Sequence, residues 1–159
     1  MNKEIEAIIL NFNEILNGEP WYGKSANAVL QNINPNFAFE KPSVNSHSLI
    51  EVLYHMVTWA EFAFDQVDKN TVDLENLEKK DWREIDIAEH SWEKGLEQFN
   101  KLHRQLIVAL TNKDDAFLEN KVSHRDYNFR YLLLGLIQHN IYHLGQIVYL
   151  DKLYKDRAI

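Results

Sequence analysis

Two histidines one helical turn apart carry the clearest chemical signal in this sequence. His139 and His143 are four positions apart. At about 100° per residue their side chains lie about 40° apart on one helix face, where both imidazoles can reach one metal ion. Taken alone the HxxxH pair is a weak signal, and it lacks the glutamate of the HExxH protease motif. The pair therefore needs support from its surroundings and from a third ligand.

The helix around the pair supplies that support, because the histidines share a face with apolar residues. The apolar residues on this side are Leu132, Leu136, Ile147 and Leu150, and the polar Gln146 also lies there. An imidazole that points into a core needs hydrogen-bond partners or a metal ion. Two of them on adjacent turns of an apolar stripe are costly without a common partner, which favours a shared metal.

His55 is the candidate third ligand. It lies midway along another helical segment and faces inward between Val52 and Trp59. The sequence has no cysteine, so any metal site must be built from histidine, carboxylate and water, and a cysteine nucleophile is excluded. Three histidines with an open fourth position are the usual form of a catalytic zinc site, and they also suit nickel or iron. We therefore predict a divalent metal site at His55, His139 and His143.

Two further polar residues face the same interior. Gln146 lies one turn from His143 and either orients an imidazole or a bound water, or hydrogen-bonds to a neighbouring helix. His103 lies in the apolar stripe of another helix, and it is a fourth ligand, a group supporting the ligands or a core histidine. We expect His103 to be a core or supporting residue.

These residues need long helices to position them, and four segments show helical periodicity without a convincing strand. We predict helices over residues 2–17, 46–69, 86–111 and 129–153. Ser48 and Glu51 fit a capping box at the start of the second. In the long connection 18–45 we expect a short helix over 25–33 capped by Ser25, with Trp21 and Tyr22 in the core. Residues 70–85 are polar and are expected to cross the surface.

The pattern predicts an all-α protein in which residues 1–159 form a single four-helix bundle domain. The net charge of −7 disfavours nucleic-acid binding. No apolar run is long enough to span a membrane, and the N-terminus lacks the features of a signal peptide. A cytoplasmic protein is the default expectation.

Two segments carry a family resemblance. HSLIEVLYHMVTWAEF and LLLGLIQHNIYHLGQI resemble the DinB-like family, also described as YfiT-like metal-dependent hydrolases, and the run Tyr142 to Ile147 is the most specific part. The resemblance implies a four-helix bundle in up-down-down-up order. It also implies a metal held by one histidine of the second helix and an HxxxH pair of the fourth. Those positions match His55, His139 and His143.

The resemblance implies a broad set of activities. Related bundles include bacillithiol and mycothiol S-transferases, a glutathione-using branch and a maleylpyruvate isomerase branch. Their metal activates a thiolate, or polarises a water or a carbonyl. For this chain, the resemblance implies a thiol S-transferase or a hydrolase that uses zinc or nickel, acts on a small molecule and forms a homodimer. The alternative is a non-catalytic, metal-stabilised bundle for dimerisation or partner binding. That structural site should be closed by a fourth protein ligand, for which His103 is the inward candidate.

Overall fold

Helices make up the regular structure of the computed structural model, which describes residues 2–69 and 71–157. Within these residues no strand forms, and only an isolated antiparallel bridge joins Lys121 to Asn128. The all-α class predicted from the sequence is confirmed. The four long helices are α1 (Lys3–Asn17), α3 (Leu49–Lys69), α5 (Trp92–Thr111) and α6 (Phe129–Arg157).

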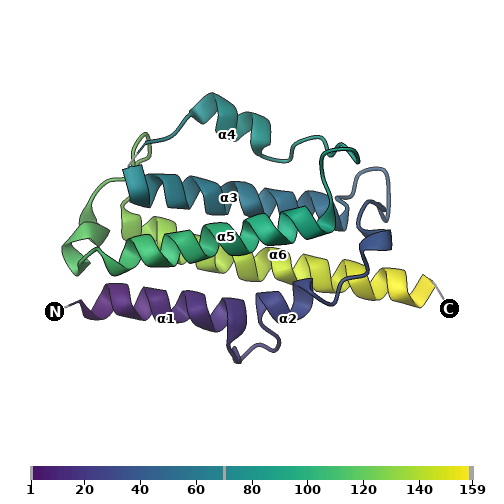
Figure 1. Ribbon diagram of the computed structural model, residues 1–159, viewed down its shortest axis with the longest axis horizontal. Coiled ribbons are helices and arrows are strands. Elements are labelled where there is room, and N and C mark those ends of the chain that lie inside the picture. Colours follow the sequence, from purple (N-terminus) through teal and green to yellow (C-terminus); the bar gives the residue numbers. More distant parts are fainter. Residues whose placement is uncertain (1, 70, 158–159) are drawn as a thin grey trace.

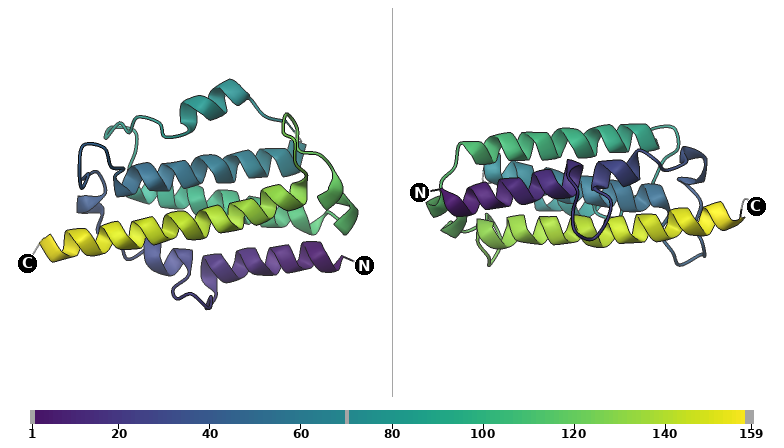
Figure 2. Two further views of the ribbon diagram at one scale, coloured as in Figure 1. Left: turned by 180° about the vertical axis from the view of Figure 1, so that it is seen from behind. Right: turned by 90° about the horizontal axis from the view of Figure 1, so that it is seen from below.

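The long helices pack along their lengths around a shared core. α3 contacts both α5 and α6, and α1 contacts the same two helices from the other side. α1 and α6 run in one direction, whereas α3 and α5 run in the opposite direction (Figure 1). The view from below shows α1 between α5 and α6 (Figure 2). The centre is filled by fully buried side chains such as Phe12, Leu53, Phe99, Leu106 and Leu133.

Local sequence explains how α3 begins and how closely α5 approaches it. The predicted capping box forms, because the Glu51 carboxylate accepts from the Ser48 N–H at 2.7 Å and Ser48 Oγ accepts from the Glu51 N–H at 3.3 Å. Gly95 allows α5 to approach α3 closely, since a Cβ there would lie 2.8 Å from Leu53 Cδ2 and 3.0 Å from Tyr54 Cε2. These features hold α3 at the centre of the molecule, with most of its residues buried.

Three predicted helix boundaries are wrong. The second long helix begins at Leu49 rather than near residue 46, because the Ser48 hydroxyl caps it by accepting from the Glu51 N–H. The third long helix begins at Trp92 rather than near residue 86, because the Ser91 hydroxyl caps it by accepting from the Lys94 N–H. Residues 86–90 form a turn instead, in which the Asp86 carboxylate accepts from the Ala88 N–H. The last helix continues to Arg157, beyond the predicted end at residue 153.

The connection before α3 also differs from its prediction. α2 (Ala26–Leu30) is shorter than predicted and is followed by the 3₁₀ turn η1 (Pro35–Phe37). Ser25 occupies the N-cap position, yet its side chain makes no capping hydrogen bond. Trp21 is fully exposed and Tyr22 is 43% exposed, so their predicted place in the core is wrong. The short loop between α1 and α2 leaves both rings on the surface.

The segment between α3 and α5 is more structured than predicted. α4 (Leu74–Lys80) forms within it, capped by the Asp73 carboxylate, which accepts from the Asn76 N–H. Leu77 is buried, so the segment packs on the core as well as crossing the surface. α4 lies outside α3 (Figure 1), and the chain after it returns across α3. The loop between α5 and α6 contains a second 3₁₀ turn, η2 (Asp115–Glu119).

Candidate metal centre

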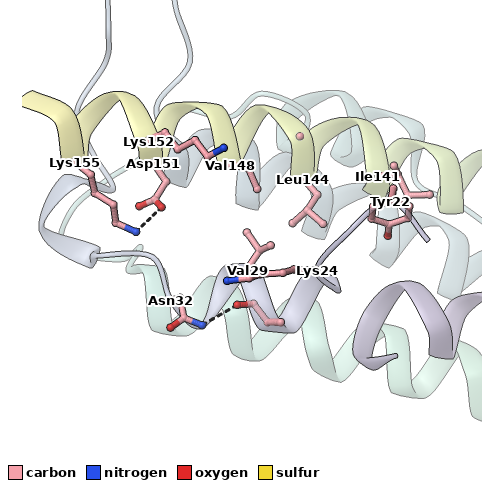
Figure 3. Close-up of a pocket in the computed structure, with 12 residues that line it drawn as sticks. Tyr22, Lys24, Val29, Asn32, Ile141, Leu144, Val148, Asp151, Lys152 and Lys155 are labelled. Atoms are coloured by element: carbon pink, nitrogen blue, oxygen red, sulfur yellow. Dashed lines mark hydrogen bonds and ion pairs between the residues drawn. The ribbon is translucent and has the colours of Figure 1, made fainter. Parts of the chain in front are cut away.

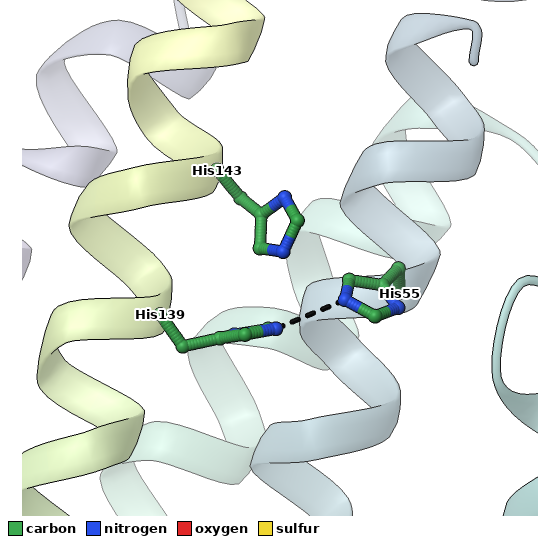
Figure 4. Close-up of side chains that lie close together, drawn as sticks. All are labelled: His55, His139 and His143. Carbon is green, nitrogen blue, oxygen red and sulfur yellow. Dashed lines mark hydrogen bonds between the residues drawn. The ribbon is translucent and has the colours of Figure 1, made fainter. Parts of the chain in front are cut away.

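The three predicted ligands come together between α3 and α6. His55 lies in the middle of α3, and His139 and His143 lie on successive turns of α6. One nitrogen from each ring can be chosen so that all three lie within 4.8 Å of one another. The shortest distance, 2.9 Å, joins Nε2 of His55 to Nε2 of His139. The three imidazoles face one another across the gap between the helices (Figure 4).

Two of the imidazoles are oriented by polar groups behind them. Asp81 Oδ1 lies 2.6 Å from His55 Nδ1, and Gln146 Oε1 lies 2.7 Å from His143 Nδ1. An oxygen acceptor at Nδ1 fixes the tautomer that carries its proton there, which leaves the Nε2 lone pair free. In both residues Nε2 is therefore available as a ligand atom.

His139 differs from the other two rings. Its Nδ1 is buried and has no hydrogen-bond partner among the described residues. Because His55 Nε2 is an acceptor, the 2.9 Å contact is a hydrogen bond only if His139 donates from its own Nε2. With a metal present, both Nε2 atoms would be ligands instead. Two nitrogen ligands of one tetrahedral zinc ion are about 3.3 Å apart, a spacing that lies between the 2.9 Å of this pair and the 4.8 Å within which all three rings place a nitrogen. The donor set fits a divalent metal.

Burial keeps these imidazoles uncharged. Burial, together with the neighbouring His143 and His55, lowers the pKa of His139 to about 3. Burial also lowers the pKa of His55 to about 4, against the opposing charge of Asp81. The pKa of His143 is lowered for the same reason, against the hydrogen bond to Gln146. At neutral pH all three are neutral, which is the form that binds a metal ion.

A tryptophan on the connection after α4 packs against the site. The Trp82 ring stacks on His55 with centroids 3.9 Å apart and on His47 with centroids 3.8 Å apart. Its backbone has φ +46°, a conformation that non-glycine residues rarely adopt. The neighbouring Asp81 Oδ1 also accepts from the Trp59 indole N–H at 3.2 Å. Residues 81 and 82 thus hold His55 from outside α3.

Asp81 and Trp82 were missed at the sequence level because they lie in a segment with no periodicity. A tryptophan is unusual within a charged surface segment, and this is the signal that could have singled out Trp82.

The two additional candidates, Gln146 and His103, have different surroundings. Gln146 contacts His143 directly, as a residue that orients an imidazole does. His103 is buried in α5, where its Nδ1 donates to the Phe99 carbonyl at 2.8 Å and its Nε2 accepts from the Asn140 amide at 2.8 Å. Both nitrogens of His103 are therefore satisfied by the core. Within the described residues the ligand group contains three histidines and no fourth histidine or carboxylate.

A hollow of about 540 Å³ lies over the ligand group. Its walls include Trp59, Trp82 and Tyr142 besides the three histidines, and His47 and Gln146 complete the lining. A larger cavity of about 600 Å³ lies elsewhere, between α2 and α6 (Figure 3). That cavity contains none of the three histidines, and its lining offers no cluster of metal ligands among the described residues.

Comparison with known families identifies the superfamily of this chain. The model of the DinB superfamily matches residues 24–147. The chain belongs to the DinB superfamily. The matched region includes His55, His139 and His143, so the resemblance seen in the sequence is confirmed. A search of curated proteins and a search of solved structures each found no match to this chain. Among residues 2–69 and 71–157, no helix combines the length and apolar character needed to cross a membrane.

Proposed function

We propose that His55, His139 and His143 bind one divalent metal ion, zinc or nickel, and that the protein is a metal-dependent enzyme acting on a small molecule. The observation that carries the proposal is the convergence of three neutral imidazoles, two of them oriented through Nδ1 by Asp81 and Gln146. When bound, the ion would act as a Lewis acid that activates a thiol or polarises a water or carbonyl.

The residues around the ligands favour thiol transfer over hydrolysis. Among the described residues, the lining of the hollow over the three histidines includes no carboxylate. The nearest one, Asp81, is already an acceptor for His55 and Trp59. A hydrolase commonly uses a general base to take a proton from water, whereas a thiol bound to a metal loses its proton outright. We therefore propose S-transfer from a low-molecular-weight thiol as the first reaction to test, with hydrolysis as the second.

The ligand group also bears on the alternative of a structural metal. Structural zinc sites have four protein ligands, whereas catalytic sites have three. The described residues supply three histidine ligands. The inward candidate for a fourth is His103, but its two ring nitrogens form hydrogen bonds to Phe99 and Asn140. This difference favours an enzyme. For the architecture we propose the up-down-down-up four-helix bundle formed by α1, α3, α5 and α6, supported by their directions in Figure 1.

Metal analysis tests the binding proposal. Wild type, His139→Ala and the control His124→Ala, which alters an exposed loop histidine, are equilibrated with zinc and desalted. We expect about one metal per chain in the wild type and in His124→Ala, and loss in His139→Ala. Equal metal content in all three proteins contradicts the proposal. The reaction is then tested with low-molecular-weight thiols and an aryl halide, and absence of metal-dependent conjugation removes S-transfer.

A further inference from the structure

A second, smaller pocket adjoins the hollow over the three histidines. It has a volume of about 200 Å³ and lies along α6 on the side toward the start of that helix. Trp59 and His139 line both spaces, with their ring centroids 6.1 Å apart. A group that fills the pocket is therefore adjacent to one of the proposed metal ligands.

The walls of this pocket are apolar and largely aromatic. Beyond Trp59 and His139, they come from the rings of Tyr127 and Tyr131 and from two buried leucines, Leu132 and Leu136. The two tyrosine rings contact each other with centroids 5.1 Å apart. Aromatic walls favour a ring packed edge-on or offset against them. For scale, an engineered apolar cavity of about 150 Å³ binds benzene, so the present volume suits a single substituted ring.

Gly135 keeps the pocket open. It lies on the wall formed by α6, and a Cβ added there would meet no atom within 4 Å. A glycine inside a helix lowers stability by about 1 kcal/mol relative to alanine. Packing against a neighbouring helix does not explain this glycine, in contrast to Gly95, where a Cβ would meet Leu53. The space beside Gly135 is available to a ligand.

We propose that this pocket binds the apolar part of the substrate, a single aromatic ring. A reactive group attached directly to that ring then lies toward the three histidines, because His139 lines both spaces. The proposal rests on the proposed function for the role of the reactive group, whereas the ring pocket itself is defined by its own walls. It assigns to the site a substrate class of small molecules with one apolar ring.

The pocket is tested first with a ring compound that carries no thiol. Benzyl alcohol is titrated into the full chain, with and without zinc, while the Trp59 indole N–H signal is followed by NMR. We expect a saturable shift in the wild type that is lost in Gly135→Leu, whose side chain fills the pocket. Gly145→Leu is the matched control, because Gly145 lies on the same helix and a Cβ there also meets no atom within 4 Å. A wild type without a saturable shift, or a Gly135→Leu variant that keeps it, overturns the proposal.

A second measurement connects the pocket to the metal. Cobalt-substituted protein is titrated with phenylmethanethiol and with ethanethiol, and the visible absorption of cobalt is recorded. We expect the preference for phenylmethanethiol over ethanethiol to be about tenfold greater in the wild type and in Gly145→Leu than in Gly135→Leu, because burying a ring contributes about 1.5–3 kcal/mol. An equal preference in the wild type and in Gly135→Leu overturns the ring pocket. If cobalt does not bind while benzyl alcohol still does, the metal proposal fails and the ring pocket stands.

Discussion

Replacing Asp81 by asparagine should weaken metal binding without removing a ligand. The carboxylate lies 2.6 Å from His55 Nδ1 and is about one-third exposed. Asparagine retains an oxygen acceptor of the same shape but loses the charge. A hydrogen bond to a charged group contributes about 1.5–3 kcal/mol and a neutral one about 0.5–1.5 kcal/mol. Because the difference is about 1–1.5 kcal/mol, we expect Asp81→Asn to raise the metal Kd about tenfold.

The assay is a competition titration with a chromophoric chelator at pH 7.5. Asp81→Ala should weaken binding further, up to about a hundredfold, because the N–H groups of His55 and Trp59 then lose their acceptor. Asp86→Asn is the matched control, since it removes one negative charge from an exposed position on the same connection. The reasoning is refuted if Asp81→Asn and Asp86→Asn change the Kd equally, because the effect would then be general charge rather than orientation of His55.

Three further predictions concern stability. Burial lowers the pKa of His103 to about 4 in the folded protein, whereas about 6.5 is expected in the unfolded chain. Between these values the unfolded chain binds the proton more readily. The free energy of unfolding should therefore be fully retained above about pH 6.5 and fall by about 3 kcal/mol toward about pH 4. Denaturant unfolding of the metal-free protein should show a shallower pH dependence in His103→Asn than in wild type, and an unchanged slope contradicts the assignment. Gly95→Ala should lower the free energy of unfolding by about 1–3 kcal/mol, because the added Cβ would meet Leu53. Gly135→Ala should leave it unchanged or raise it by up to about 1 kcal/mol, because a Cβ there meets no atom. Equal effects of the two substitutions in urea unfolding would show that helix propensity, rather than the contact with Leu53, determines the stability. Zinc at a hundred times its Kd should stabilise the wild type by about 2.7 kcal/mol and leave the Tm of His139→Ala unchanged, which calorimetry can check.

The parts of the site that follow helical periodicity could be predicted from the sequence. The inward positions of His139 and His143 follow from their spacing within an apolar stripe, and His55 follows from the stripe of α3. The capping box of Ser48 and Glu51 was likewise readable, because its residues interact over three positions. Helical spacing and capping patterns join residues a few positions apart, and packing of the long helices keeps the apolar faces that they predict turned inward.

The parts that depend on non-local contacts could not be predicted. Asp81 reaches His55 across 26 positions of sequence, through a connection whose polar composition suggests only a solvent-exposed crossing. The positive φ of Trp82 has no signature in its residue type, because left-handed backbone usually selects glycine or asparagine. Trp21 shows the converse error: its size favours a core position, yet the turn between α1 and α2 leaves it fully exposed.

The three proposed ligands and the carboxylate that orients His55 belong to parts of the chain under different constraints. The imidazoles are set by α3 and α6, whose burial makes most substitutions costly. Asp81 belongs to a surface connection whose backbone is fastened separately, where the Thr58 hydroxyl donates to the Lys80 carbonyl at 3.1 Å. Affinity at the proposed metal site should therefore depend on the residue at position 81, whereas the positions of the three histidines depend on α3 and α6. In evolution or in protein engineering, we expect substitutions in this connection to convert a tightly bound ion into an exchangeable one without altering the helices.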